Sequence, residues 1–133
     1  MKTALAVVLI AAGLLLVVRP AIAHHAFSAE FDANKPVTLT GTVTKVEWTN
    51  PHAWFYIDVA DACGKVTNWA FELGGPNTLI REGWTRNSMK VGETVTVEGS
   101  RAKDGSPIAN AQVVTLKSTG QRLFAASSRG EQK

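Results

Sequence analysis

The sequence predicts a mainly β domain, a five-stranded OB-like Greek-key barrel with one short helix between its third and fourth strands. Three observations carry this prediction: apolar and polar residues alternate in five segments, turn residues separate those segments, and a helical pattern occurs once. The order of three strands, a helix and two strands, opened by a long strand, is that of an OB-fold. A flat sandwich or a simple meander with one helix remains an alternative.

The first strand is expected to be long and bent. Its apolar positions change parity near Thr44 and Lys45, which predicts a β-bulge at that point. The pair Asn50-Pro51 ends the strand. Before the bulge, one face of the strand carries Val37, Leu39, Gly41 and Val43.

The next two strands, 53–60 and 66–73, form a predicted hairpin joined by the turn 61–64. The turn contains Cys63, the single cysteine of the chain, which should be exposed and cannot form an intramolecular disulfide. Alternation places Phe55, Ile57, Val59, Trp69, Phe71 and Leu73 on the inner face. The opposite face then carries His52, Trp54, Tyr56, Asp58, Asn68, Ala70 and Glu72.

After this hairpin, Pro76 begins a predicted helix over 76–84. Strands follow at 94–101 and 108–116, the second with a bulge between Ala111 and Val114, and an edge strand at 122–124. Ile80 and Trp84 are four residues apart and are expected to cover the same patch of sheet. The predicted core comprises Trp48, Phe55, Ile57, Trp69, Phe71, Leu79, Ile80, Val95 and Val97.

The first 23 residues have the pattern of a cleaved signal peptide. Lys2 precedes an uncharged apolar run over 4–18, and Ala21-Ile22-Ala23 supplies the small residues that a signal peptidase needs. We therefore expect export to the periplasm and no stable membrane anchor after cleavage. An uncleaved anchor is the alternative. The rest divides into a polar lead-in over 24–36, the barrel domain over 37–124 and a flexible tail over 125–133.

The charge balance argues against nucleic acid as a partner. Removing Lys2 and Arg19 with the signal peptide leaves 12 of the 14 basic residues against 11 acidic ones, a net charge of +1. A nucleic-acid groove needs clustered Lys and Arg, although OB-folds often stack single strands on aromatic side chains. No nucleophile elbow, paired-carboxylate spacing or phosphate loop indicates an enzyme.

Cleavage after Ala23 would make His24 the first residue of the mature chain. A terminal amine has a pKa near 7.7–8.0, so it can bind a metal at neutral pH together with its own imidazole. Copper favours imidazole nitrogen in tetragonal geometry. One hypothesis is therefore a copper site formed by His24 and His52, with His25 as a substitute ligand and Glu30 or Asp32 as an outer carboxylate. Alternatively, the two terminal histidines are a mobile tail.

A second hypothesis is a binding protein without metal chemistry. Its binding face would consist of Trp54, Tyr56, Asp58, Asn68 and Glu72 on the outer side of the hairpin. Aromatic side chains beside polar groups suit a small molecule, a peptide or a sugar. The alternative is that the lead-in covers Trp54 and Tyr56, because Phe27 and Phe31 must be buried somewhere.

Five motifs make the chain similar to a known family. They lie at 24–27, 30–32, 48–54 (which contains Asn-Pro-His-x-Trp), 69–72 and 92–99. It resembles an uncharacterised family of small exported bacterial proteins, classed as a domain of unknown function. The resemblance implies export and a single domain, and it brings no catalytic residue. Element order and the last motif also give a fold-level likeness to exported bacterial OB-fold proteins of the stress-related type.

Overall fold

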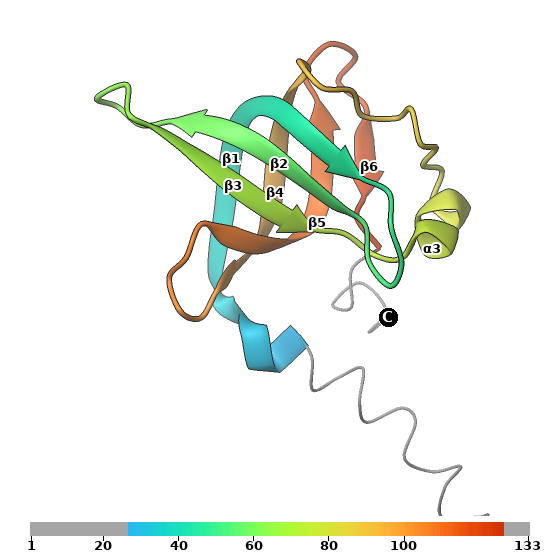
Figure 1. Ribbon diagram of the computed structural model, residues 1–133, viewed down its shortest axis with the longest axis horizontal. Helices are drawn as coiled ribbons and strands as arrows, with labels where there is room; N and C mark the ends of the chain where they lie inside the picture. The colour runs from blue at the N-terminus through green and yellow to red at the C-terminus, as the bar shows by residue number, and fades with distance from the viewer. Residues whose placement is uncertain (1–26, 127–133) are drawn as a thin grey trace, which may run out of the picture.

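The computed structural model describes residues 27–126, and these form a mainly β fold, as the sequence predicts (Figure 1). The predicted signal peptide, His24, His25 and the tail beyond residue 126 lie outside the described residues. One helical turn over 27–30 leads into the first strand. The elements are β1 (Phe31–Glu47), β2 (Trp54–Ala60), β3 (Val66–Glu72), α3 (Pro76–Arg81), β4 (Thr94–Ala102), β5 (Ile108–Leu116) and β6 (Arg122–Phe124).

The strands form a six-stranded sheet in the order β3-β2-β1-β4-β5-β6, with an additional pairing between β3 and β5. That additional pairing is parallel, whereas all the other pairings are antiparallel. Each strand from β1 to β5 therefore has at least two strand neighbours, and β6 pairs with β5 alone. Figure 1 shows β1 as a long, strongly curved strand that crosses from β4 to β2.

Both expected bulges are present. In the β1–β2 pairing the register shifts between Val43 and Lys45, which confirms the bend predicted there. In the β4–β5 pairing, Glu98 lies opposite Val113 and Gly99 opposite Ala111, so β5 carries one extra residue at the predicted place. β1 begins at Phe31, earlier than the expected Val37, and its register with β4 is irregular between Phe31 and Pro36.

The core lies between the inner faces of the strands and is closed on one side by α3. Phe55, Ile57, Phe71, Leu79, Val95 and Val97 are fully buried, as predicted. Trp48 and Trp69 are half-buried and pack against the edge of this cluster. Leu73 is also buried, on the inner face where alternation placed it, although the predicted core did not include it. The predicted core also left out several other buried residues, among them Val43, Met89, Val114 and Leu123.

The prediction that Ile80 is in the core is wrong, since 56% of this residue is exposed. The helix ends at Arg81 and does not reach Trp84, because Gly83 adopts a φ of 95° and turns the chain. The Trp84 amide then donates to the Leu79 carbonyl at 2.9 Å. Leu79 is thus the helix residue that faces the sheet, and Trp84 reaches the core from the loop instead of from the same helical face as Ile80.

The hairpin turn is held by one carboxylate. Asp61 accepts hydrogen bonds through Oδ1 from the amides of Cys63 and Lys65, both at 2.9 Å. Cys63 is a free, exposed thiol, as the sequence predicts. Within residues 27–126, no helix has the length and apolar character that crossing a bilayer requires.

Candidate functional site

A pocket of about 570 Å³ lies between the lead-in, the loop that joins β1 to β2, the end of β3 and α3. This volume is within the range that small-molecule sites occupy. Most of the wall comes from segments that are remote in the sequence. The lining residues are Phe27, Glu30, Phe31, Thr49, Asn50, Pro51, His52, Trp54, Glu72, Gly74, Gly75, Thr78 and Ala126.

An imidazole and a buried carboxylate meet in this wall. His52 Nδ1 lies 3.0 Å from Glu72 Oε1. Glu72 ends β3 and is 6% exposed, while His52 sits in the loop before β2 with its side chain 40% exposed. Burial raises the pKa of the Glu72 carboxyl; His52 acts in the opposite direction and Glu30 adds to the increase.

The contact with Glu72 also orients the imidazole ring. When the neutral ring donates from Nδ1, the other ring nitrogen, Nε2, remains as an acceptor or a metal ligand. The loop is fixed beneath the ring, because Thr49 Oγ1 donates to the His52 carbonyl at 3.1 Å and the Ala53 amide donates to the Gly74 carbonyl at 3.0 Å. The backbone thus places His52 beside the last residue of β3.

The lead-in supplies an aromatic wall. The rings of Phe27 and Phe31 lie 5.7 Å apart between centroids, and Phe31 is only 3% exposed. Trp54, half-buried at the start of β2, lines the same pocket. The two phenylalanines therefore lie on the side of the hairpin that carries Trp54. As one alternative, the sequence analysis expected the lead-in to cover this side.

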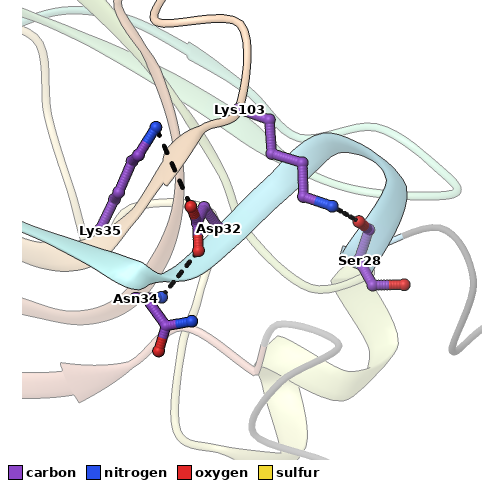
Figure 2. A network of polar contacts seen from close by, with 5 residues as sticks. All are labelled: Ser28, Asp32, Asn34, Lys35 and Lys103. Carbon is purple, nitrogen blue, oxygen red and sulfur yellow. Dashed lines mark hydrogen bonds and ion pairs between the residues drawn. The ribbon is translucent and has the colours of Figure 1, made fainter.

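Polar contacts hold the lead-in against the turn between β4 and β5 (Figure 2). The Lys103 amide donates to the Glu30 carbonyl at 2.9 Å, and Lys103 Nζ donates to the Ser28 carbonyl. The Asp32 side chain accepts from the Asn34 amide at 2.9 Å and lies 3.9 Å from Lys35 Nζ. Asp32, one of the two predicted outer carboxylates, thus makes its contacts within the lead-in. The carboxylate that contacts His52 is Glu72.

The five residues of the predicted binding face share one side of the hairpin but have different surroundings. Only Trp54 and Glu72 line the pocket. The Tyr56 hydroxyl donates to Glu47 Oε2 at 3.0 Å. Asn68 Nδ2 donates to Asp58 Oδ1 at 2.8 Å.

The part of the predicted binding face that lies outside the pocket is therefore engaged in polar contacts among its own residues and their neighbours. A hydrogen bond from Lys45, and a second from Tyr56, lower the pKa of Glu47. Lys45 Nζ lies 5.3 Å from the centre of the Tyr56 ring. Asn68 Nδ2 also donates to Thr44 Oγ1 at 3.1 Å. The pocket end, with Trp54 and Glu72, is the part of the predicted face best placed for a ligand.

Sequence reasoning missed the pocket's opposite wall. Gly75 approaches Pro51 so closely that a Cβ added to it would lie 2.8 Å from the Pro51 carbonyl oxygen. The available signal in the sequence was the run Gly74-Gly75-Pro76 between β3 and α3. The change of direction from strand to helix explains this run only in part. The second glycine also lets the loop after β1 close against this corner.

Asn110 is a second feature that sequence reasoning missed. It is fully buried on β5, directly beside Glu72 in the β3–β5 register. Neither polar atom of its side chain has a hydrogen-bond partner among the described residues. A polar residue between Ala109 and Ala111 in an apolar strand was the available signal.

Of the three predicted metal ligands, only His52 can be placed. His24 and His25 lie outside the described residues. Among residues 27–126 there is no group of three or more His, Cys, Asp or Glu side chains arranged to hold a metal ion. A metal at His52 would therefore need donors from the chain before Phe27 or from a ligand.

Comparison with protein families supplies the family. Residues 11–111 match the model of DUF6152, a family of unknown function. The chain belongs to this family. The match confirms the family resemblance predicted from the sequence motifs. No curated protein matches the chain.

The DUF6152 match covers almost the whole pocket. Every lining residue from Phe27 to Thr78 falls within the matched region, as do His24 and His25, while Ala126 and β6 lie beyond it. The DUF6152 description assigns no activity. The function therefore has to be argued from the chemistry of the pocket.

Proposed function

We propose that this DUF6152 protein is an exported periplasmic binding protein that holds a small ligand in the pocket beside His52 and Glu72. The pocket itself carries the proposal, since its volume of about 570 Å³ suits a small molecule. Apolar side chains form part of its wall, and a few polar groups converge within it. Export is supported by the apolar run and the Ala21-Ile22-Ala23 sequence at the start of the chain.

We further propose that the strands form an OB-like Greek-key barrel. Three features support it: β3 pairs in parallel with β5, β1 pairs with both β2 and β4, and the helix lies between β3 and β4. OB barrels bind ligands with one outer sheet face and the adjoining loops. The pocket lies at such a place, because the outer side of β2 and β3 meets the loop after β1 and the lead-in.

Blocking the pocket should abolish ligand binding. Thr78 lines the pocket from α3, whereas the neighbouring Asn77 is exposed and outside the lining. We expect a fragment screen by two-dimensional NMR to find small molecules that shift the pocket signals, including the Trp54 indole. The variant Thr78→Trp should lose these shifts and Asn77→Trp should keep them. Fragments that bind both variants equally would place binding elsewhere and contradict the proposal.

Copper is the second candidate ligand, and one observation favours it. Phe27, three residues after His24, lines the same pocket as His52. Three residues span at most about 11 Å, so His24 can lie close to the pocket. Glu72 on Nδ1 of His52 is the outer carboxylate that a metal-binding imidazole commonly has, and it leaves Nε2 for the metal. The His24 amine and ring would complete the ligand set, with His25 as a substitute.

The copper proposal predicts that the affinity for Cu(II) depends on a free amino group at His24. A protein that begins at His24 should bind Cu(II) tightly, with nitrogen hyperfine coupling in its electron paramagnetic resonance spectrum. Adding one Met before His24 removes the amine from the chelate, so affinity should fall by at least about tenfold, or 1.4 kcal/mol. His52→Ala should lower it as well. Equal affinity in all three proteins would exclude this site.

A further inference from the structure

We propose that the ligand of this pocket is a small organic cation, a protonated amine or a quaternary ammonium group. This inference rests on the proposed binding function and adds the chemical class of the ligand. The charge of the lining residues and the aromatic wall carry it together. Neither depends on the chain before Phe27, so the inference is separate from the copper candidate.

The lining is acidic. Among the described residues that line the pocket, Glu30 and Glu72 are carboxylates, His52 is an imidazole, and none is Lys or Arg. Such a lining attracts a cation and repels an anion. The lower dielectric constant of a half-buried site strengthens both effects. An anionic ligand would have to be buried against Glu72 without a Lys or Arg partner in the lining, which is costly.

Two basic side chains, Lys103 and Arg81, contact residues of the lead-in and of α3. Lys103 Nζ donates to the Ser28 carbonyl on the lead-in. Arg81 Nη2 donates to Thr78 Oγ1 at 3.2 Å on α3. Neither Lys103 nor Arg81 belongs to the lining. The ionisable groups of the lining itself are therefore two carboxylates and the imidazole of His52.

The aromatic wall selects organic cations over simple metal ions. Phe27, Phe31 and Trp54 line the pocket together with the two carboxylates. A cation over an aromatic face is attracted by the ring electrons, more strongly when water is excluded, with Trp the strongest partner. Methyl or methylene groups around the charge would also bury apolar area against these rings. A strongly hydrated inorganic ion gains neither advantage.

Buried Glu72 offers the cation a carboxyl group at a fixed position, and the approach of a cation favours the charged form of that group. The contact between His52 Nδ1 and Glu72 Oε1 positions the Glu72 carboxyl group. The same pocket is lined by a second carboxylate, Glu30. A charged group in a site of this kind is stabilised when an opposite charge approaches within about 4–6 Å. The ligand is thus expected to place its cationic end between Glu72 and the Trp54 ring.

Three probes of one shape test the inference on the full mature chain. Choline is the cation, 3,3-dimethylbutan-1-ol is its neutral isostere, and 3,3-dimethylbutanoate is the anion. Each is titrated while the Trp54 indole signal is followed by NMR. We expect choline to bind at least about tenfold more tightly than the neutral probe, a difference of 1.4 kcal/mol, and the anion not to bind.

Variants tie the preference to the pocket. Glu30→Gln and Trp54→Leu should each weaken choline binding, measured by isothermal titration calorimetry because Trp54→Leu removes the indole signal. Glu98→Gln should not weaken it, because Glu98 lies on β4 beside Arg122 and outside the pocket lining. Neutral or anionic probes that bind as well as choline would overturn the cation class and leave the pocket function standing. If none of the three probes shifts the Trp54 signal, the cation class is also overturned, and the fragment screen above then decides the pocket function separately.

Discussion

Replacing Phe71 with alanine is expected to lower the free energy of unfolding by about 3–5 kcal/mol, the usual cost of removing a buried phenylalanine ring. Phe71 is fully buried on β3, and its ring stacks on that of Phe55 with centroids 5.2 Å apart. It is also paired with Ala109 in the parallel β3–β5 ladder. The cavity would therefore open where β3 meets both β2 and β5.

Urea unfolding followed by tryptophan fluorescence measures this loss. The matched control is Phe124→Ala, since Phe124 is 62% exposed on β6 and should cost less than about 0.5 kcal/mol. A Phe71→Ala variant that unfolds within about 1 kcal/mol of the parent protein would show that this junction of strands is not the centre of the core.

Replacing Gly41 with alanine is expected to cost free energy near the upper end of the ~1–3 kcal/mol typical of overpacking. A Cβ added at Gly41 would lie 2.3 Å from the Asp58 carbonyl oxygen and 3.1 Å from a methyl group of Val59. The first of these atoms belongs to the backbone, so it cannot rotate away. β1 or β2 would have to move at the place where β1 crosses from one neighbour to the other.

Thr38→Ala is the control on the same strand, because Thr38 is exposed and pairs with Glu98 in the regular part of β1. It should change stability by less than about 0.5 kcal/mol. Thermal unfolding of the two variants decides between the alternatives. Equal melting temperatures for Gly41→Ala and Thr38→Ala would mean that the strands do not approach each other as closely as described.

The strands and their bends could be predicted from the sequence because they are local patterns. Alternation identified the hairpin and its inner face, with Phe55 and Ile57 both fully buried. Parity changes located both bulges, since one extra residue reverses every later side chain on the strand. Turn residues such as Asp61 act within a few positions, so the sequence alone predicted that turn as well.

The end of α3 and the exposure of Ile80 could not be predicted in the same way. The spacing of Ile80 and Trp84 fits one helical face only if the helix continues, and Gly83 turns the chain before it can. Glycine inside a helical pattern is tolerated often enough that it did not settle the end of the helix. Leu79 and Trp84 reach the core from different backbone conformations, which the apolar pattern does not distinguish.

The pocket was only half visible in the sequence for a related reason. His52, Trp54 and Glu72 share one face of a hairpin, and alternation was enough to group them. The opposite wall, which includes Pro51 and Gly75, is brought there by tertiary packing. The lead-in phenylalanines were placed near Trp54 only as one of two alternatives. Alternation could not separate Tyr56 and Asn68 from the residues of the pocket. Their hydrogen bonds to Glu47 and Asp58 depend on which strands lie beside them.

Native mass spectrometry of the protein, produced with its own first 23 residues and purified gently from the periplasm, tests the central claim most directly. We predict a polypeptide mass that begins at His24, with a bound small molecule or metal ion that Thr78→Trp removes and Asn77→Trp retains. A chain that still begins at Met1, or bound mass that is the same in both variants, would contradict an exported protein whose ligand occupies this pocket.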